Sequence, residues 1–508
     1  MARKSILLVT VDCLRADHVG FMGYGRPTTP LLDGLAAESF VFPAAIVAGA
    51  PTYYSFPAIL ASRYPLALGR DVLGLAPGEP TLASVLKEAG YATASFGAAN
   101  PYISSRFGYE QGFDTFRDFL NDEFPAPFDG KHADHTSHAA RDSGWMNRLN
   151  RAIQKVRPSL GPLGIAYDEL YFQYCQRVTS AAESLDALRR FPAADMIVDH
   201  ACEWLASVGD GPFFLWLHLM DPHAPYYPKE QALALMGCDP VTPFRARYLN
   251  SYWNRSDIGP QRLSSHSNEI INLYDSGIRW VDEQMRRLIG TLRGSKKWDN
   301  CIFAFTADHG EEFLDHGGRF HPPSRLSEEL TRVPLLLRVP VAAGNCKKNT
   351  AKGVFSMLHL APTLLDAAQL PVPPAFQGRS YWPQVCAGET FDAIAISESV
   401  AGCTNPLHPE NRLGPRVLSV RERRFKLSLH FDPKREELYD LEADPGENAP
   451  VAPTAQKPVR RRLLEIAHEH LRRARDERLR LQARVHELRL EWEKPANRAS
   501  PVISQPAH

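Results

Sequence analysis

Two short apolar segments, far apart in the chain, each lead into acidic residues. Residues 5–11 read Ser-Ile-Leu-Leu-Val-Thr-Val and are followed by Asp12. Residues 301–305 are apolar and lead into Asp308 and His309. Continuous apolar runs of this length are typical of buried parallel strands, whose carboxyl ends meet at one edge of a sheet. The sequence therefore predicts an open α/β sheet that binds a divalent metal ion at this edge.

Five segments resemble, in the same order, the motifs of the sulfatase branch of the alkaline phosphatase superfamily. They are residues 11–18, 29–35, 213–226, 306–318 and 437–447. The resemblance implies an alkaline-phosphatase-like three-layer α/β sandwich with a mostly parallel central sheet. It also implies a small C-terminal antiparallel sheet subdomain. The apolar content of 44% suits a globular enzyme.

The composition and the resemblance together divide the 508 residues into parts. Residues 1–388 are expected to form a sulfatase-like catalytic domain. Its helical insertion at 118–192 matches no family motif, and it either covers an active-site cleft or forms a structural hairpin. Residues 389–453 are expected to form the C-terminal β subdomain. Residues 454–494 predict a charged helix, which packs on the body of the protein, forms a homo-oligomer contact or is solvated, and a solvated helix is the expectation. Residues 495–508 predict a disordered tail.

Charge and cysteine content narrow the choice of partners and compartment. The 58 basic and 58 acidic residues balance, so no overall field draws the chain to nucleic acid. We find no apolar stretch long enough for a transmembrane segment, and the short run near the N-terminus lacks the cleavage site of a signal peptide. The eight cysteines are scattered without a Cys-x-x-Cys pair. This pattern predicts free thiols and a cytoplasmic location.

The resemblance implies that Asp12, Asp308 and His309 bind one divalent metal ion. Two carboxylates and one imidazole suit Mg, Mn, Zn or Ca. His309 stands where calcium sulfatases often carry Asn, which disfavours Ca. Cys13 stands where many family members carry a second acidic residue. Its thiol either points away from the metal or shifts the preference of the site toward a softer metal, and we expect it to be a buried small apolar side chain.

A second metal is the alternative arrangement for this site. In two-zinc relatives the additional ligands are an Asp and two His. Asp221, His223 and His321 occur in this order, although not at the relatives' spacing. Such a pair of ions would bind both the attacking and the leaving oxygen.

The expected nucleophile is Thr52, which would also contact the metal. Sulfatases carry a Cys/Ser-x-Pro-Ser-Arg motif about a dozen residues before a Gly-x-Tyr-Pro sequence, and the Cys or Ser is oxidised to formylglycine. Counted back from the Tyr-Pro pair at 64–65, this motif falls on residues 52–56. Thr52 then takes the nucleophile position, Phe56 replaces the Arg, and Ser55 is retained. A shifted alignment would make Ser55 the nucleophile.

This substitution favours phosphorus over sulfur chemistry. Formylglycine hydrate expels sulfate by collapsing to the aldehyde, whereas threonine has no second hydroxyl. Threonine is the nucleophile in phosphodiesterase and phosphotransferase branches of the superfamily, where a metal lowers the hydroxyl pKa. We therefore favour cleavage or transfer of a phospho-ester of a small molecule, saccharide or lipid. Sulfuric ester hydrolysis without formylglycine and a non-catalytic binding protein are the alternatives.

Three further residues are expected to act on the ester. His223 matches the family His that contacts the transferring group. His321 lies where relatives place a His or Lys that steadies or protonates the leaving oxygen, a role suited to an imidazole. Arg15 would compensate for the Arg replaced by Phe56, or it would support the first loop. The polar residues expected to be weaker candidates or parts of a polar loop are His218, Asp221, Glu311, Glu312 and Asp315.

Overall fold

The computed structural model describes most of the chain. The described residues are 3–70, 72–120, 150, 153, 155–156, 161–179, 182–340, 350–391 and 394–493. The predicted tail at 495–508 and much of the first half of the predicted insertion lie outside them.

A seven-stranded sheet forms the centre of the molecule, in the order β2-β11-β7-β1-β6-β4-β5. Its strands are β1 (Ser5–Val11), β2 (Phe40–Val41), β4 (Ala92–Gly97), β5 (Thr115–Arg117), β6 (Phe213–Leu219), β7 (Cys301–Ala307) and β11 (Leu335–Arg338). Strands β7, β1, β6, β4 and β5 run parallel, and β11 pairs antiparallel with β7. The predicted mostly parallel central sheet is therefore confirmed.

The three central strands are apolar along their whole length because both faces of the sheet are covered. Every residue of β1, β6 and β7 is buried. Val11, the last residue of β1, pairs with Ala307 on one side and with Leu219 on the other. The three strands therefore end level with one another, and the residues that follow them meet at one edge.

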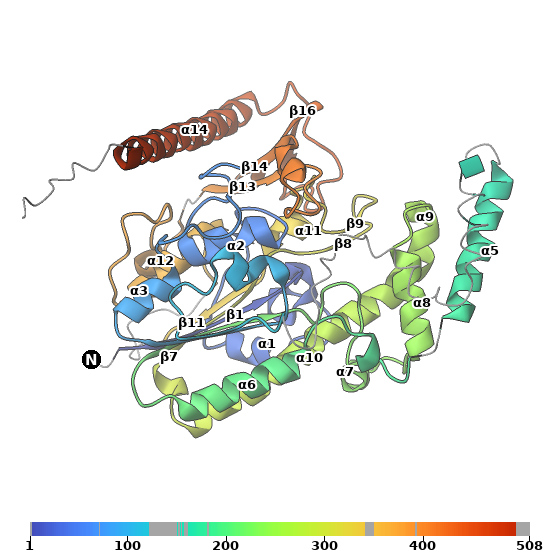
Figure 1. Cartoon of the computed structure of the whole chain (residues 1–508), viewed down its shortest axis with the longest axis horizontal. Helices are drawn as coiled ribbons and strands as arrows, with labels where there is room; N and C mark the ends of the chain where they lie inside the picture. Colours follow the sequence, from blue (N-terminus) through green and yellow to red (C-terminus); the bar gives the residue numbers. More distant parts are fainter. Residues whose placement is uncertain are drawn as a thin grey trace, which may run out of the picture.

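Helices cover both faces of this sheet, which gives the predicted three layers (Figure 1). The helices on one side are α2 (Thr52–Ala61), α3 (Leu82–Glu88) and α12 (Leu360–Ala367), and those on the other are α1 (Pro30–Ala36), α6 (Ala194–Ser207) and α10 (Ser267–Gly294). The shorter elements are α7 (Glu230–Leu235), α8 (Pro243–Trp253), α9 (Pro260–Leu263), α11 (Glu328–Thr331), α13 (Trp382–Ala387), β3 (Ala45–Ile46), β8 (Glu312–Phe313), β9 (Arg319–Phe320), β10 (Arg332–Val333) and β12 (Phe355–Ser356).

Side chains fix where two of these helices begin. The Thr81 hydroxyl accepts a hydrogen bond from the backbone N–H of Ser84, and the Ser84 side chain accepts one from the backbone N–H of Thr81. This reciprocal pair is a capping box, and it starts α3 where the sequence suggests. Asp282 of α10 accepts hydrogen bonds from the backbone N–H groups of Leu31 and Leu32. It thereby satisfies the first turn of α1, whose N–H groups have no partner within the helix.

A four-stranded antiparallel sheet follows the central domain, as predicted. Its strands are β13 (Ile394–Val400), β14 (Arg416–Glu422), β15 (Phe425–Phe431) and β16 (Lys434–Asp440), and they are neighbours in chain order. Consecutive strands of this kind need only short turns between them, which explains why this segment lacks the strand–helix alternation of the first part.

The long C-terminal helix α14 (Lys457–Glu493) packs on this sheet through its first half. Leu463 is fully buried and belongs to the same apolar cluster as Leu418 of β14. The His470 Nε2 atom lies 3.2 Å from the Glu398 Oε2 atom of β13, and both side chains are buried. The expectation of a solvated helix is therefore wrong for this half.

The described part of the predicted insertion contains helix α5 (Pro162–Val178). Phe172 packs edge-on against the ring of Tyr248 on α8, with 5.5 Å between the ring centroids. The Glu169 carboxylate lies 2.7 Å from the guanidinium of Arg255. This helix is thus attached to α8 by aromatic contacts of Phe172 with Tyr248 and Tyr252, and to the segment after α8 by the ion pair with Arg255.

The cysteines depart from their predicted state. The free cysteines among the described residues are Cys13, Cys175, Cys202, Cys238, Cys301 and Cys403, whereas Cys386 is disulfide-bonded. Because disulfides persist mainly in oxidising compartments, the cysteine content does not support the predicted cytoplasmic location. Within the described residues, no helix combines the length and the apolar character that crossing a membrane requires.

The contact between α14 and the C-terminal sheet can be tested with one substitution. Leu463→Ala should lower the free energy of unfolding by about 2–5 kcal/mol, because it leaves a cavity between α14 and β14. Leu413→Ala is the matched control, since Leu413 is 67% exposed, and its effect should stay within about 0.5 kcal/mol. Calorimetric unfolding of the three proteins measures both. Equal stability of the Leu463 variant and the wild type would contradict the packed position of α14.

Candidate active site and metal centre

Four neighbouring parallel strands, β7, β1, β6 and β4, deliver polar side chains to the same edge of the sheet. These residues lie at or just beyond the strand ends: Asp308 and His309 after β7, Asp12 and Cys13 after β1, His218 and His223 at the end of β6, and Asn100 after β4. Ligand sites of open α/β sheets lie outside the carboxyl ends of the strands, as this cluster does.

The predicted metal ligands Asp12, Asp308 and His309 are brought together. Their donor atoms all lie within 4.8 Å of one another, and the three side chains are fully buried. The His309 Nε2 atom is 3.5 Å from Asp12 Oδ1 and 3.6 Å from Asp308 Oδ2. The other ring nitrogen, Nδ1, lies 2.8 Å from the carbonyl oxygen of Gly310. A carbonyl can only accept, so Nδ1 carries the proton and Nε2 faces the carboxylates with a free lone pair.

The charges of this trio fit a divalent cation. The Asp308 Oδ2 atom is buried and has no hydrogen-bond partner among the described residues. Burial and the nearby Asp12 carboxylate raise the pKa of Asp308. Burial also disfavours ionised Asp12, but the imidazoles of His223, His218 and His309 hold its pKa well below the usual range. Two buried carboxylates and one imidazole nitrogen form a donor set for a hard or borderline divalent ion.

Two residues that the sequence did not predict as main site residues, Asn100 and His218, contact Asp12. The Asn100 side-chain amide donates to Asp12 Oδ2 at 2.8 Å. His218 Nε2 lies 3.4 Å from the same oxygen, while its Nδ1 lies 3.0 Å from Thr10 Oγ1. Asn100 follows β4 by three residues, so the strand-end argument that selects Asp12 also selects Asn100 once β4 is placed beside β6.

The three predicted ligands Asp12, Asp308 and His309 are called the metal cluster below. Thr52 is the first residue of α2 and contacts this group of side chains directly. Its Oγ1 atom lies 3.2 Å from His309 Nε2, and the residue is 4% exposed. The N-terminus of a helix carries partial positive charge, which favours an anionic group beside Thr52. The Ser55 hydroxyl is also buried, but it has no hydrogen-bond partner in the described part of the chain. Of the two hydroxyls considered from sequence, Thr52 is therefore the one with a contact to the metal cluster.

Phe56 occupies an apolar environment on the same helix. Its ring is fully buried, 5.1 Å from the ring centroid of His218 and 5.4 Å from that of Trp216. Position 56, which carries Arg in the sulfatase motif, therefore packs against His218 and supplies no positive charge.

Cys13 is buried as expected, but its thiol belongs to the polar cluster. The Sγ atom donates to Asp12 Oδ1 at 3.2 Å and lies 3.3 Å from His321 Nδ1. Burial, together with the Glu311 and Asp12 carboxylates, raises the pKa of the thiol well above its usual value. The backbone φ of Cys13 is +60°, a conformation uncommon for residues other than glycine. The expectation of an ordinary small apolar residue is therefore incomplete.

His223 and His321 lie beside this cluster. Their ring centroids are 5.2 Å apart, and the centroid of His321 is 4.7 Å from that of His309. Phe191, near the end of the predicted insertion, packs edge-on against His223 at 6.2 Å. The insertion therefore contributes at least this aromatic ring to the border of the site.

Asp221 does not join His223, which excludes the two-metal arrangement built on it. Its carboxylate accepts hydrogen bonds from Arg189 at 2.8 Å and from the backbone N–H of Ala194 at 2.9 Å. Both side chains of the ion pair are buried. Burial raises the pKa of Asp221 to about 6, although Arg189 opposes this shift. The Asp221-Pro-His223 sequence thus places His223 beside the site and Asp221 in a structural ion pair.

The contacts of Arg15 do not fit the prediction that it binds the ester. A guanidinium has five N–H donors, and here each one is used. Two go to Asp17, two to Asp315 and one to the carbonyl oxygen of Glu311, at distances of 2.8–3.1 Å. The alternative role considered for Arg15, support of the first loop, is the one that these contacts favour.

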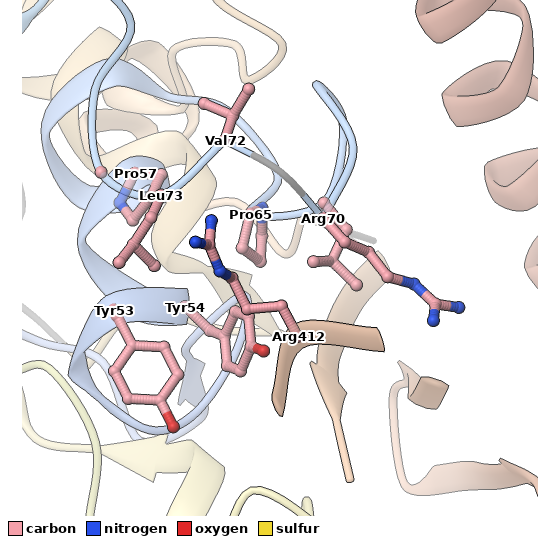
Figure 2. Close-up of a pocket in the computed structure, with 10 residues that line it drawn as sticks. Tyr53, Tyr54, Pro57, Pro65, Arg70, Val72, Leu73 and Arg412 are labelled. Atoms are coloured by element: carbon pink, nitrogen blue, oxygen red, sulfur yellow. The ribbon is translucent and has the colours of Figure 1, made fainter. Parts of the chain in front are cut away.

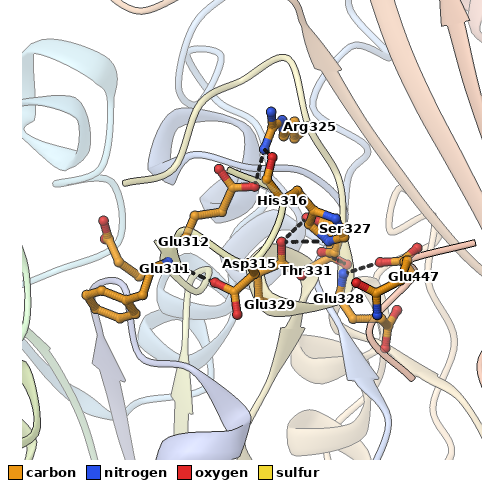
Figure 3. Close-up of polar contacts among 12 residues, drawn as sticks. Glu311, Glu312, Asp315, His316, Arg325, Ser327, Glu328, Glu329, Thr331 and Glu447 are labelled. Carbon is orange, nitrogen blue, oxygen red and sulfur yellow. Dashed lines mark hydrogen bonds and ion pairs between the residues drawn. The ribbon is translucent and has the colours of Figure 1, made fainter. Parts of the chain in front are cut away.

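The loop after His309 contains a buried carboxylate, Glu311, which was expected only as part of a polar loop. Glu311 is fully buried; its Oε2 atom lies 3.1 Å from His321 Nδ1 and its Oε1 accepts the Tyr226 hydroxyl at 3.1 Å. Figure 3 shows this loop, where Glu312 pairs with Arg325 at 2.7 Å. The two adjacent glutamates therefore have different partners: Glu311 contacts His321 and Tyr226, and Glu312 pairs with Arg325.

The C-terminal sheet holds the far end of the same loop. Glu447 accepts a hydrogen bond from the backbone N–H of Glu328 at 2.6 Å (Figure 3). Lys426 of β15 lies 3.0 Å from Glu447 and 3.4 Å from Glu328, and its side chain is 1% exposed. Arg421 also pairs with Glu328. These buried charges balance one another, so the network supports the loop without a further ion.

A separate narrow pocket lies beside α2 and is distinct from the metal cluster. Its lining includes Tyr53, Tyr54 and Pro57 of this helix together with Arg70 and Arg412 (Figure 2). The Tyr53 hydroxyl donates to the carbonyl oxygen of Cys403. The two tyrosines after Thr52 thus anchor the helix against the loop that contains Cys403 and leave Thr52 at the metal cluster.

Known proteins resemble this chain in sequence and in fold. The sulfatase family model matches residues 4–370, and the model described as N-sulphoglucosamine sulphohydrolase, C-terminal, matches residues 320–476. The chain is 24% identical over 474 residues to an arylsulfatase of Clostridium perfringens, covering 88% of this chain and 89% of that protein. A solved structure in complex with its substrate D-glucosamine-2-N,6-O-disulfate has a TM-score of 0.63 at 18% identity, covering 93% of this chain and 98% of the other. The phosphonate monoester hydrolase of Agrobacterium radiobacter has a TM-score of 0.60 at 19% identity, covering 94% and 96%.

The assignment of Arg15 to support can be tested by stability. Arg15→Lys should lower the free energy of unfolding by roughly 1.5–3 kcal/mol, because lysine cannot replace the bidentate bonds to two carboxylates. Arg473→Lys, at a side chain that is 74% exposed, is the matched control and should leave the unfolding transition unchanged. Denaturant unfolding of both variants provides the measurement. An unaltered transition in the Arg15 variant would argue against the supporting role.

Proposed function

Because the chain belongs to the sulfatase family, we propose that it cleaves or transfers a phospho-type ester with Thr52 as the nucleophile. The family assignment makes the protein a hydrolase of sulfuric or phosphoric esters. The observation that carries the finer proposal is the position of Thr52, with its Oγ1 atom 3.2 Å from His309 Nε2 at the start of α2.

The chemistry of threonine separates the two ester types. A sulfatase with formylglycine releases sulfate when the aldehyde hydrate collapses, and this needs two oxygens on one carbon. Thr52 carries one hydroxyl on a secondary carbon, so a sulfated intermediate would have to wait for direct attack by water. A phosphorylated threonine can be resolved by in-line attack of water or of an acceptor alcohol at phosphorus. This difference is the reason for placing phospho-esters before sulfate esters.

We assign the metal to Asp12, Asp308 and His309, with Thr52 beside them. A divalent cation bound there would lower the pKa of the Thr52 hydroxyl and screen the negative oxygens of the transferring group. Two carboxylates with one imidazole favour Mg, Mn or Zn over Ca. His218 and Asn100 then hold Asp12 in place, since both contact its Oδ2 atom.

The proposed reaction proceeds in two balanced steps. Thr52 Oγ forms a bond to phosphorus while the bond from phosphorus to the leaving oxygen breaks; the hydroxyl proton passes to solvent and the leaving oxygen gains one. Water, or an acceptor alcohol in the case of transfer, then attacks the phosphothreonine and restores the hydroxyl. His223 and His321 lie beside Asp12 and Cys13, and we assign them to the oxygens of the transferring and leaving groups.

The proposal predicts a specific loss in a Thr52 variant. Thr52→Ala should abolish turnover of p-nitrophenyl phosphate and bis-p-nitrophenyl phosphate, because no nucleophile remains. Metal content, measured by elemental analysis, should stay near the wild-type value because Asp12, Asp308 and His309 are unchanged. Thr52→Ser is the matched control and should retain part of the activity. Full activity of the alanine variant would refute the nucleophile assignment.

The same assay separates the two ester classes. The wild type should hydrolyse the phosphate esters and not p-nitrophenyl sulfate when tested with Mg, Mn, Zn and Ca. Thr52-dependent turnover of the sulfate ester would instead establish a sulfatase that works without formylglycine.

The ligand assignment has its own test. Asp308→Asn should lower both metal content and turnover at least tenfold, because a neutral amide replaces a buried anionic ligand. Asp299→Asn lies just before the other end of the same strand, is exposed, and should leave both unchanged. Retained metal in the Asp308 variant is the result that would exclude Asp308 as a ligand.

A further inference from the structure

A groove lies between the C-terminal helix α14 and the body of the protein. It is lined by the segment after α2, the start of β14, the end of β15 and the middle of α14. Its volume of about 360 Å³ is in the range of small-molecule sites. The lining residues on which the argument depends are Arg70, Arg416, Phe431, Leu471 and Arg475.

We propose that this groove binds a small organic anion that carries a phosphate- or sulfate-type group on an apolar body. The site is separate from the one that cleaves the ester, because none of the residues assigned to metal binding or to the reaction lines the groove. The inference therefore does not depend on the proposed function.

The guanidinium of Arg416 is the strongest evidence for a ligand. Its side chain is only 18% exposed. Its Nε atom is buried and has no hydrogen-bond partner among the described residues. The carboxylate that faces this atom, Glu398 Oε2, is 3.8 Å away, which is beyond hydrogen-bond distance. Because a buried donor without a partner is costly, the oxygens of a bound anion would stabilise this side chain.

Glu398 balances the charge of Arg416 only in part. The carboxylate is fully buried and does not line the groove. Its Oε1 atom accepts a hydrogen bond from the backbone N–H of Leu66 at 3.0 Å, and its Oε2 atom lies 3.2 Å from His470 Nε2. The negative charge of Glu398 is thus shared between several partners, which leaves positive charge on the groove side of Arg416.

The remaining polar lining has the same sign of charge. Arg70 and Arg475 also line the groove, and no acidic residue within the described parts of the chain does. Arg70 Nη1 donates to the carbonyl oxygens of Leu413 and Gly414 at 3.0 and 2.7 Å, which fixes its position. The planar fork of an arginine binds two oxygens of one phosphate or sulfate group at once. Three arginines from three segments therefore favour a tetrahedral oxyanion.

The other part of the lining is apolar. Phe431, the last residue of β15, is 41% exposed, which is unusual for a large aromatic side chain. Leu471 and Ala474 of α14 line the groove together with this ring. A bare inorganic ion would leave these side chains in contact with water, whereas an organic group attached to the anion would cover them. This is the reason for proposing an organic anion.

The position of the groove connects α14 to the segment that follows α2. Leu66 and Arg70 line both this groove and the narrow pocket beside α2 (Figure 2). A ligand that contacts Arg70 on one side and Arg475 on the other would join the helix to the body of the protein. Because it would bind the folded chain and not the unfolded one, it should also raise the temperature of unfolding.

Calorimetric titration of the full-length protein tests the site. The probes are phenylphosphonate and benzenesulfonate, which contain no ester bond, and a chelator removes divalent ions from the metal cluster. The wild type should bind one equivalent of at least one probe. Arg416→Gln should weaken this binding at least tenfold, because a charged donor is lost. Arg473→Gln is the matched control: it removes the same charge from α14 at a side chain that is 74% exposed, and its affinity should equal that of the wild type.

Two further variants keep the test decisive if the Arg416 variant does not fold. Arg475→Gln changes an exposed residue and should weaken the binding of the same probe. Phe431→Ala should weaken the binding of the organic probes and leave that of inorganic phosphate unchanged. The probe that binds more tightly shows whether the site prefers a phosphate-type or a sulfate-type group.

The results that would overturn the inference are equally specific. Absence of binding by the wild type, or equal affinities of the wild type and the Arg416 and Arg475 variants, would exclude an anion site in this groove. Inorganic phosphate that binds as tightly as phenylphosphonate would reject the apolar part of the ligand. None of these results bears on turnover by Thr52, so the proposed function stands or fails by its own tests.

Discussion

The structure depends on keeping two carboxylates, Asp12 and Asp308, buried side by side in the core. Each ion loses its hydration on burial, which costs several kcal/mol, and like charges at short distance add to this cost. The carboxylates cannot move apart, because β1 and β7 are paired in register and both strands are buried over their whole length. Opposite charge must therefore come from elsewhere; the nearby imidazoles provide part of it, and the proposed divalent cation would provide the rest.

The loops around this pair are held by ion pairs that the site itself does not use. Arg15 joins the loop after β1 to the loop after β7 through Asp17 and Asp315. Lys426 and Glu447 bind the far end of the second loop from the C-terminal sheet. The small C-terminal sheet therefore supports the candidate site. It fixes the loop that carries Asp308, Glu311 and His321, whose positions must hold within fractions of an ångström for metal binding.

The sequence predicts that Asp12, Asp308 and His309 come together, because each follows a buried strand, whereas their role as metal ligands was implied by the family resemblance and stays a prediction. Buried parallel strands are recognisable as short apolar runs, and the residue after each run must lie at the carboxyl edge. The roles of Arg15 and Asp221 could not be obtained in this way, since they depend on which partners the folded chain places nearby. The burial of Glu311, which was expected only as part of a polar loop, was not predicted for a related reason: its contact with Tyr226 is distant in sequence. The burial of Leu463 shows the same limit, because a helix rich in charge can still present one apolar side to a sheet.

The departures from the sulfatase motif are connected in a way that argues for a rebuilt site over a decayed one. Loss of the motif's Arg would leave a hole or an unpaired charge if nothing else had changed, yet Phe56 fills this position and packs against His218 and Trp216. His218 in turn contacts Asp12, so the substituted residue helps to position a predicted metal ligand. A protein that only bound a ligand would not need the Gly310 carbonyl to fix the tautomer of His309, nor a hydroxyl 3.2 Å from the free nitrogen of that ring. Both are costly to keep in a buried site, and both are what a threonine nucleophile beside a metal requires.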